Sequence, residues 1–385
     1  ILALLVFYTY LGYGMVLWLL VKIKQTVFSS NQESTNSTYP HVTLLIAAYN
    51  EEDIVEMKMA NNRELEYTEG KLAIVWVTDG STDDTVARLK KYEDATVYHI
   101  DERGGKTKAI NRVMPFIKSP ITVYTDANTI LNTDSIIQLV HQFEDPNVGC
   151  VAGEKRIAVD ATDTASSSGE GFYWRYESAL KTLDYKLYSA VGAAGELYAI
   201  RTSLFEPQPC DALLDDFMLS MQIAAQGYKI AYCPQASATE YGSADMKEEE
   251  KRKVRIAAGG LQSIWRLRKL LNVFRYGVLT FQYVSHRVLR WSITPFALVL
   301  LLPLNVGIVC MTDGKQQLLY IILLLLQIGF YILGFFGYYL AKRKIKNKIL
   351  FIPYYFLFMN INVFKGIPYL IKKKNGTWDK ARRKG

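Results

Sequence analysis

The sequence predicts an α/β domain with a mostly parallel sheet, flanked by transmembrane helices. Half of the 385 residues are hydrophobic, and the most apolar stretches lie near the two ends of the chain, as is typical of a membrane protein. Between them, strand-like runs alternate with helical patterns, which implies right-handed crossovers between parallel strands. The net charge of +8 does not indicate nucleic acid, because Lys and Arg gather at 341–348 and 372–384 beside apolar segments, as the positive-inside rule predicts.

The first segment, residues 1–21, is nearly uncharged and long enough to cross a bilayer as a transmembrane helix. It lacks the small-residue cleavage site of a signal peptide, so we interpret it as an anchor. The chain begins at Ile1 without Met, and we therefore expect residues upstream. Residues 22–40 form a predicted linker rich in Ser, Thr and Asn. The four cysteines show no ligand spacing, which indicates reduced thiols in a cytosolic compartment.

Four predicted strands follow in the first half of the soluble domain, each leading into a helical pattern. They lie at 41–48, 71–78, 96–100 and 121–125. In open α/β sheets ligands bind at the carboxyl ends of the strands. Polar residues directly after these strands are therefore candidates for a binding site.

The second half of the domain changes pattern. A strand-like run at 148–157 leads to a Ser/Gly-rich loop at 165–169 and then to an aromatic helix. A strand at 196–200 precedes a helix from 213 to 226, which Gly227 ends. The remaining elements are a charged helix at 247–258 and an amphipathic helix at 262–274, which we place at the membrane surface within an interfacial region of 261–288.

The C-terminal membrane segments occupy 289–371. Those at 289–310 and 318–340 have clear length, whereas the one at 349–371 contains Pro and polar residues. The charge bias places the basic tail, 372–385, in the cytoplasm. We therefore expect 349–371 to be re-entrant or to lie at the interface.

Two polar positions follow predicted strands. Asp126 and Asn128 are hard oxygen donors one residue apart, which suits a divalent cation shared with a diphosphate, although such residues also close turns. Asp79 ends the second strand, where its carboxylate can accept hydrogen bonds from a base or ribose. Asp79 and Gly80 are also a common turn pair.

Three further motifs carry charge. Lys106 follows two glycines at a helix start, where backbone N–H groups and an ammonium can meet phosphate oxygens, or where a flexible loop simply ends. Asp215 and Asp216 at another helix start are either a dipole-stabilising cap or a pair whose pKa values separate to provide a general base. Arg255 belongs to a basic run that is either a solvated helix face or a source of cations for a leaving diphosphate.

In this order the motifs resemble the membrane-bound family 2 glycosyltransferases, which include synthases of hyaluronan, cellulose, chitin and poly-N-acetylglucosamine. The residues that carry the resemblance are Ile46-Ala47-Ala48-Tyr49-Asn50-Glu51-Glu52, Asp79-Gly80-Ser81-Thr82-Asp83, Gly105-Lys106-Thr107-Lys108-Ala109-Ile110-Asn111, Asp126-Ala127-Asn128 and Asp215-Asp216. It covers about residues 40 to 270 and extends loosely to the flanking spans and to 377–380.

The resemblance implies a GT-A fold, the Rossmann-like nucleotide-diphospho-sugar transferase domain, over 41–260, and inverting transfer from a UDP-sugar. It implies nucleotide-sugar binding by Ala48, Glu51, Asp79, Lys106 and Asp126. Glu51 is expected near the base of the nucleotide and Lys106 near its phosphates. It also implies Mg²⁺ or Mn²⁺ at Asp126 and Asn128, and catalysis by Asp216 as base with Asp215 and Arg255.

The sequence departs from the family pattern at two positions. Asn128 stands where the family has Asp, which keeps an oxygen ligand and removes a charge. The family motif Gln-x-x-Arg-Trp appears here as Arg252-Lys253-Val254-Arg255-Ile256, so the Arg remains and the Gln and Trp are lost. That Trp is associated with the acceptor in polymerising members, so we expect short products or single transfers.

We therefore expect an integral protein of the inner or plasma membrane with a cytoplasmic catalytic domain. Its expected function is transfer of a sugar to a saccharide acceptor in bacterial-type extracellular or cell-surface polysaccharide synthesis. The alternative is transfer of one sugar to a polyprenyl phosphate or another lipid acceptor. A third option, a tethered nucleotide-sugar-binding module without activity, is disfavoured by the intact acids and Arg255. Expected partners are the UDP-sugar, a saccharide or lipid-linked acceptor, membrane lipids, and export or polymerisation proteins.

Overall fold

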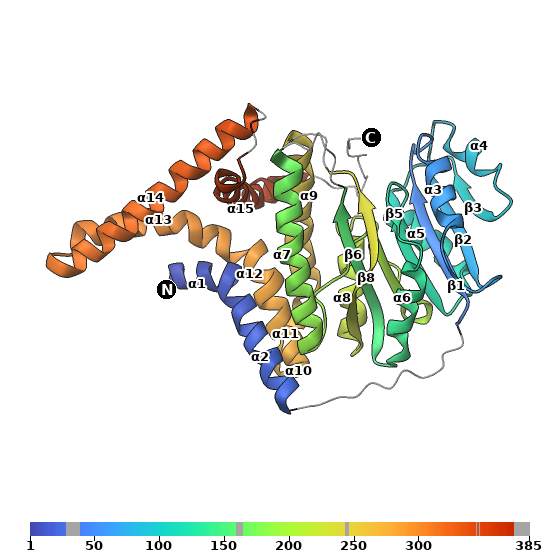
Figure 1. Cartoon of the computed structure of the whole chain (residues 1–385), viewed down its shortest axis with the longest axis horizontal. Coiled ribbons are helices and arrows are strands. Elements are labelled where there is room, and N and C mark those ends of the chain that lie inside the picture. Colours follow the sequence, from blue (N-terminus) through green and yellow to red (C-terminus); the bar gives the residue numbers. More distant parts are fainter. Residues whose placement is uncertain (28–38, 159–164, 243–245, 344, 346, 373–385) are drawn as a thin grey trace.

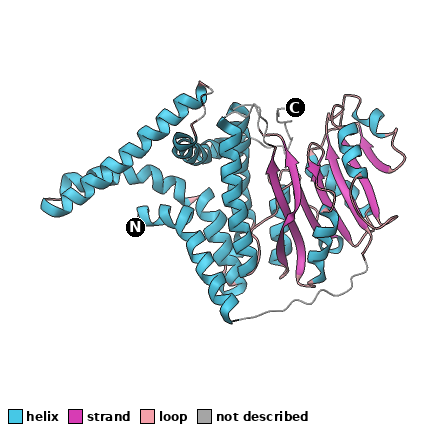
Figure 2. Cartoon of the chain, in the orientation of Figure 1, coloured by secondary structure: helices cyan, strands magenta, loops and turns pink. Residues whose placement is uncertain are grey.

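The computed structural model describes residues 1–27, 39–158, 165–242, 246–343, 345 and 347–372. A twisted sheet with helices on both faces stands beside a layer of long helices, from which the apolar helices of residues 293–342 project away (Figures 1 and 2). Of the linker predicted at 22–40, residues 22–27 instead continue the first helix to Val27, and residues 28–38 lie outside the described residues. Residues 373–385 of the predicted tail, which include the loosely similar 377–380, also lie outside them.

The sheet has eight strands in the order β3-β2-β1-β4-β7-β6-β8-β5. The first four are parallel, whereas β7 runs antiparallel between β4 and β6. The α/β prediction is thus confirmed, but β5 and β8 were not predicted. The strands are β1 Val42–Ala48, β2 Leu72–Asp79, β3 Ala95–Ile100, β4 Ile121–Asp126, β5 Ile130–Leu131, β6 Val148–Ile157, β7 Leu197–Arg201 and β8 Lys229–Glu240.

Short helices cover both faces of the sheet and create two cores. Alternate residues of β1 face opposite sides, so Leu45 packs with one core and Leu44 with the other. The first core lies under α5 and α8, and the second under α3, α4 and α6. These helices are α3 Val55–Arg63, α4 Thr85–Leu89, α5 Lys106–Val113, α6 Ser135–His141 and α8 Asp215–Ala225.

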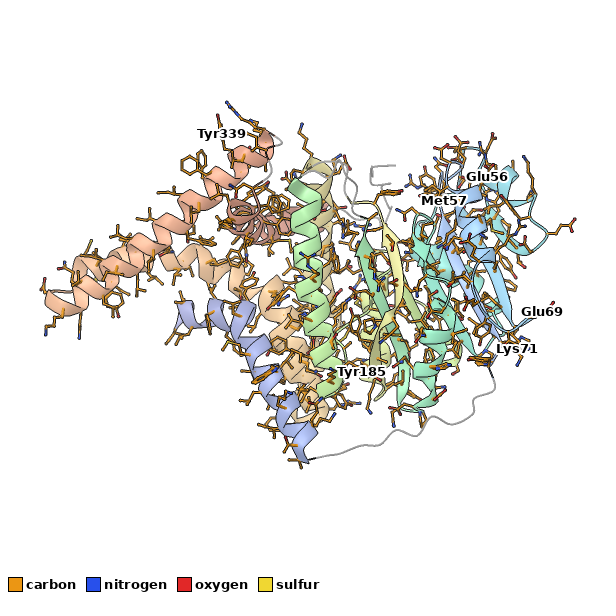
Figure 3. All side chains as sticks on the ribbon, in the orientation of Figure 1. Glu56, Met57, Glu69, Lys71, Tyr185 and Tyr339 are labelled. Carbon is orange, nitrogen blue, oxygen red and sulfur yellow. The ribbon has the colours of Figure 1, made fainter. Side chains whose placement is uncertain are left out.

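Two long helices, α7 Ala165–Leu187 and α9 Met246–Arg266, separate the sheet from the apolar helices (Figure 1). Residues 165–169, predicted as a loop, form the first turns of α7. Tyr185, near the end of α7, packs against both cores of the sheet, and Figure 3 shows it at this junction.

The sequence predicted separate helices at 247–258 and 262–274. The predicted break between them is wrong, because α9 continues through Gly259 and Gly260 to Arg266. These glycines allow close packing: a Cβ atom at Gly259 would lie 2.6 Å from Leu214 Cγ, and one at Gly260 2.4 Å from Trp291 Cδ2. Tertiary contact thus outweighs the low helix propensity of glycine. Short helices follow α9, namely η5 Arg268–Leu271, α10 Val273–Tyr276, α11 Val278–Tyr283, η6 Val284–Val288 and α12 Leu289–Trp291.

Four helices in the described part of the chain are long and apolar enough to cross a membrane. The first comprises α1 Leu2–Phe7, η1 Tyr8–Gly12 and α2 Tyr13–Val27, and the others are α13 Ile293–Met311, α14 Gly314–Lys342 and α15 Lys348–Lys372. A break at Ser292 makes α13 start later than the predicted 289. Because α15 is one continuous helix despite Pro353 and Pro368, it is not a re-entrant hairpin. Its interfacial orientation stays a prediction.

Polar contacts tie the first helix to the end of the chain. Thr9 Oγ1 lies 3.0 Å from Thr294 Oγ1 in α13, and the Tyr10 hydroxyl donates to Asn360 Oδ1 in α15 at 2.7 Å. The N-terminal helix is therefore packed against the C-terminal helices rather than attached only through its sequence neighbours.

Candidate active site

The predicted nucleotide-sugar residues meet at one edge of the sheet. In the parallel register, Ala47 of β1 pairs with Asp126 of β4, and Ala48 pairs with Thr78 of β2, the residue before Asp79. Because all three strands run in the same direction, Ala48, Asp79 and Asp126 emerge at the same edge.

Asp79 is buried and organises the loop that begins α5. Its Oδ2 accepts hydrogen bonds from the backbone N–H groups of Gly104 at 2.8 Å and Gly105 at 2.5 Å. Its Oδ1 lies 3.7 Å from Arg112 Nη1 and has no hydrogen-bond partner among the described residues. One oxygen of Asp79 therefore holds the loop, while the other is buried and keeps an unused acceptor position.

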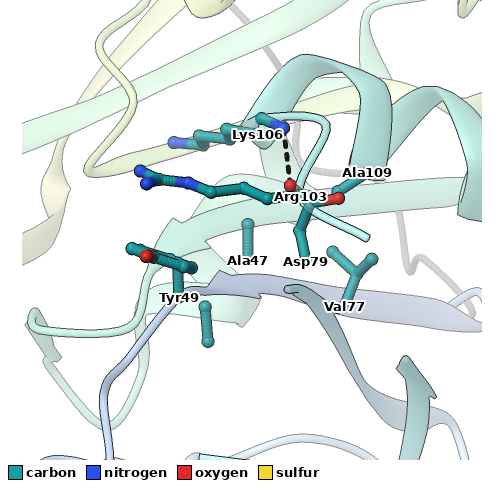
Figure 4. A pocket seen from close by; sticks show the side chains of 9 residues that line it. Ala47, Tyr49, Val77, Asp79, Arg103, Lys106 and Ala109 are labelled. Atoms are coloured by element: carbon teal, nitrogen blue, oxygen red, sulfur yellow. Dashed lines mark hydrogen bonds between the residues drawn. The ribbon is translucent and has the colours of Figure 1, made fainter. Parts of the chain in front are cut away.

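A pocket opens above Asp79 and is lined by β1, β2 and the start of α5 (Figure 4). Across it, the Arg103 guanidinium lies 3.8 Å from the centroid of the Tyr49 ring. Neither side chain was a predicted site residue, although Tyr49 follows Ala48 and Arg103 precedes the two glycines. A guanidinium over an aromatic ring provides a surface that suits contact with a planar base. Residues lining the pocket are Ala47, Ala48, Tyr49, Val77, Asp79, Arg103, Gly105, Lys106 and Ala109.

Glu51 lies in the loop after β1 and is buried. Its backbone N–H donates to the Thr85 hydroxyl at 2.8 Å, which ties this loop to the start of α4. The expectation that Glu51 lies near the base stays a prediction.

Lys106 and Asp126 form an ion pair, with Nζ 2.6 Å from Oδ1. Burial would lower the pKa of Lys106, but the carboxylates of Asp126, Asp215 and Asp216 outweigh burial and raise that pKa. Lys106 is therefore charged and stands between the metal motif after β4 and the acid pair of α8.

Asp215 and Asp216 begin α8 as predicted. The Phe217 backbone N–H donates to Asp216 Oδ1 at 2.8 Å. Burial, together with the neighbouring charge of Asp215, raises the pKa of Asp216 to about 7, although Lys106 acts in the opposite direction. A carboxylate with such a pKa is well matched to proton transfer near neutral pH.

Two glycines in the loop before β7 pack closely against the start of α8, where Asp216 lies. Gly192 has φ of 84°, and a Cβ atom there would lie 2.2 Å from Phe217 Cδ2. A Cβ atom at Gly195 would lie 3.2 Å from Asp216 Oδ2 and 3.5 Å from Lys106 Nζ. Gly192 therefore leaves room for the Phe217 ring, and Gly195 leaves room for the two charged groups and brings backbone directly against them.

Arg255 lies in α9, one turn before Gly259, which packs against Leu214 at the start of α8. Residues four apart share a helix face, so Arg255 lies on the face directed toward α8. It makes no hydrogen bond or ion pair with the part of the chain that the structure describes. This leaves its guanidinium available to an anionic ligand.

The metal prediction fits these residues only in part. Within the described residues, no group of three or more His, Cys, Asp or Glu side chains could hold a metal ion. Asp126 and Asn128 supply two oxygen donors, and Lys106 already pairs with Asp126 Oδ1. Such a set suits an ion that keeps several other ligands, as Mg²⁺ does with nucleotide phosphates.

Residues 40–259 match the family described as "Glycosyltransferase like family 2". The chain is 27% identical over 237 residues to a poly-beta-1,6-N-acetyl-D-glucosamine synthase of Staphylococcus aureus, covering 58% of this chain and 56% of that protein. It is 30% identical over 175 residues to a beta-monoglucosyldiacylglycerol synthase of Nostoc sp., covering 43% of this chain and 36% of that protein. The chain thus spans about half or less of the length of these relatives.

Among solved structures, a mannosyltransferase from Pyrobaculum calidifontis, determined in complex with GDP-Man and Mn²⁺, is similar over 97% of this chain and 100% of that one. The TM-score is 0.70 and the sequence identity 20%. This similarity confirms the predicted GT-A fold.

Proposed function

Because the chain belongs to the family 2 glycosyltransferases, we propose that it transfers a sugar from a UDP-sugar to an acceptor hydroxyl and inverts the anomeric centre. The observation that carries the proposal is Asp216, whose pKa is raised to about 7 beside Lys106 at the ligand edge of the sheet. The proposed acceptor is a saccharide, in line with the name of the Staphylococcus aureus relative.

The proposed donor site is the pocket above Asp79. Asp79 Oδ1 would accept a hydrogen bond from the uracil or ribose, and the ring of Tyr49 with Arg103 would pack against the base. Ala48, which has a small side chain, would allow the nucleoside to approach the end of β1.

The proposed proton transfer runs to Asp216. The acceptor oxygen attacks the anomeric carbon, its proton moves to the Asp216 carboxylate, and the bond from that carbon to the diphosphate oxygen breaks. UDP leaves with the bonding electrons. Attack from the face opposite UDP inverts the anomeric centre.

The leaving diphosphate needs cations, and Lys106 and Arg255 would supply them. A divalent ion held by the diphosphate with Asp126 and Asn128 would add Lewis-acid stabilisation. Lys106 would move from Asp126 toward the phosphate when the nucleotide binds, because both groups attract the same ammonium.

A lipid acceptor is the second candidate. It is favoured by the Nostoc relative, named a beta-monoglucosyldiacylglycerol synthase, and by the four apolar helices that adjoin the domain. In either case we place the catalytic domain on the cytoplasmic side, where nucleotide sugars are made.

A panel of labelled nucleotide sugars, incubated with the purified full chain and a mixed pool of acceptors, tests the proposal. We expect consumption of one UDP-sugar, short products, and loss of transfer in excess chelator. Consumption of a GDP-sugar alone would overturn the donor assignment, and full activity in chelator would overturn the metal assignment.

A further inference from the structure

Three lysines converge on the indole ring of Trp174. The Nζ atoms of Lys155, Lys181 and Lys253 lie 4.9, 5.9 and 6.0 Å from the centroid of Trp174 in α7. They come from β6, α7 and α9, and their relative exposures are only 3%, 4% and 4%. Buried lysines are rare unless they are paired, so each ammonium should have an anionic neighbour.

Two of the three lysines have such neighbours. Lys155 forms ion pairs with Glu196 and Glu240, and Lys253 lies 3.4 Å from Glu249. These pairs account for their charges.

Lys181 is different. Among the described residues it forms no hydrogen bond and no ion pair. Its Nζ lies 5.6 Å from the centroid of the Tyr232 ring and 5.9 Å from that of Trp174. The carboxylates of Glu177, Glu154 and Glu196 act on it only through their charges, without a hydrogen bond or ion pair. The nearby Glu154 instead accepts hydrogen bonds from the Ser178 and Tyr232 hydroxyls. An ammonium this deeply buried normally has an oxygen partner.

Burial lowers the pKa of Lys181, and the charge of Glu177 only partly offsets this effect. An anionic ligand would reverse the balance, because it favours the charged form.

The cluster adjoins the catalytic acid. Glu196, the partner of Lys155, directly follows Gly195, whose Cβ position lies 3.2 Å from Asp216 Oδ2. The Lys155–Glu196 ion pair therefore connects the cluster to the loop segment that contacts Asp216.

The cluster also adjoins a membrane helix. The Tyr355 ring of α15 lies 5.7 Å from Lys253 Nζ, and its hydroxyl donates to Glu249 at 2.9 Å. Asn362 lies seven residues after Tyr355 on the same helix face. It is buried, and both atoms of its amide lack hydrogen-bond partners within the described residues. Figure 1 shows α15 beside α7 and α9.

We propose that Lys181 and Trp174 form an acceptor subsite that binds a phosphate ester, so that the acceptor is a saccharide linked through phosphate to a lipid. The inference rests on the proposed function. The phosphate pairs with Lys181, the indole packs against the group beside the phosphate, and the lipid chain runs along α15. The sugar hydroxyl then reaches Asp216. Trp174 of α7 thus supplies the aromatic contact with the acceptor that is lost where Ile256 of α9 replaces the family Trp.

Binding measurements on the purified full chain in an uncharged detergent test the subsite. The probes are farnesyl phosphate, farnesol and inorganic phosphate, and the variants are Lys181→Met, Lys181→Arg and Lys186→Met. Lys186 is an exposed lysine of the same helix and provides the matched control. UDP affinity is measured in parallel for every variant.

We expect farnesyl phosphate to bind more tightly than farnesol or inorganic phosphate. Lys181→Met should weaken its binding roughly ten- to a hundredfold, as expected for the loss of a charge-assisted hydrogen bond. Lys181→Arg should bind within a few fold of the wild type, and Lys186→Met should not differ. UDP affinity should be unchanged in all three variants.

Equal binding of farnesol and farnesyl phosphate, or unchanged binding by the Met variant, would overturn the subsite. Inorganic phosphate that binds as tightly as farnesyl phosphate would show a free-anion site and would overturn the acceptor assignment. If the wild type did not bind UDP, the proposed function would be contradicted. The comparison of farnesyl phosphate binding between the wild type and the Lys181 variants would still test the subsite.

Discussion

At the scale of single residues, the central assignment is that Asp216, rather than Asp215, takes the proton. The two acids are adjacent at the start of α8, but only Asp216 contacts the backbone of Phe217 and lies against Gly195. Its position beside Lys106 places it next to the residues that end β4. Asp215 acts on the reaction mainly through its charge, which contributes to the raised pKa of its neighbour.

Asp216→Asn keeps the size of the side chain and removes its basicity. We expect UDP binding to survive, while the transfer rate falls by about 10²–10⁴, the range for loss of a general base. Asp215→Asn should reduce the rate less. Steady-state rates and UDP affinities of both variants check this, and near-normal turnover of the Asp216 variant would mean that another residue is the base.

The pH dependence follows from the same pair. Asp216 is active when ionised, so the rate should rise with pH and level off above about 7. Removing the charge of Asp215 in Asp215→Asn should move this limb to lower pH. A pH profile of kcat/KM for the two proteins decides the matter, and an unchanged or upward-shifted limb in the variant would contradict the assignment.

The stability of the folded state should decrease as the pH rises, whereas the transfer rate increases. The pKa of Asp216 is raised on folding, so ionising this group disfavours the folded state. That destabilisation is absent below the unfolded pKa, grows as pH rises, and is complete above about 7. Asp216→Asn should therefore gain thermal stability over the wild type at pH 8 and little at pH 4, in parallel with its loss of activity.

At the scale of elements, α9 connects the membrane helices to the site. A Cβ atom at Gly366 of α15 would lie 2.9 Å from Ala258 N and 3.0 Å from Ala257 Cβ of α9. Gly259, on the next turn after Arg255, packs against Leu214. The helix that carries Arg255 is thus held between α15 on one side and the start of α8 on the other.

Gly366→Leu should push α15 away from α9, with an overpacking destabilisation of about 1–3 kcal/mol. It should also lower transfer more than UDP binding, because Arg255 moves and the pocket above Asp79 does not. Gly329→Leu is the matched control, since a Cβ atom at Gly329 of α14 meets nothing within 4 Å. Melting temperatures and transfer rates in detergent distinguish the two variants. Equal effects of both substitutions would argue against a specific role of the contact between α15 and α9.

At the scale of the whole molecule, the parallel strands and their polar ends were predictable because each depends on local sequence. Strand periodicity and the residues after each strand place Asp79 and Asp126 at a common edge once the sheet is parallel. The unbroken α9 was not predictable, because Gly259 and Gly260 usually end a helix and only their contacts with Leu214 and Trp291 explain why they do not. The Lys181 cluster was equally hidden, since its members are distant in sequence.

The hydrogen bond between Thr9 and Thr294 has a consequence for biogenesis. The first helix leaves the ribosome 285 residues before its partner, an interval on the order of tens of seconds at about 5–20 residues per second. During that time the Thr9 hydroxyl can bond only within its own helix, where it already donates to the Leu5 carbonyl at 2.8 Å. The first helix therefore enters the bilayer with its polar group internally satisfied, and final assembly waits for the last part of the chain.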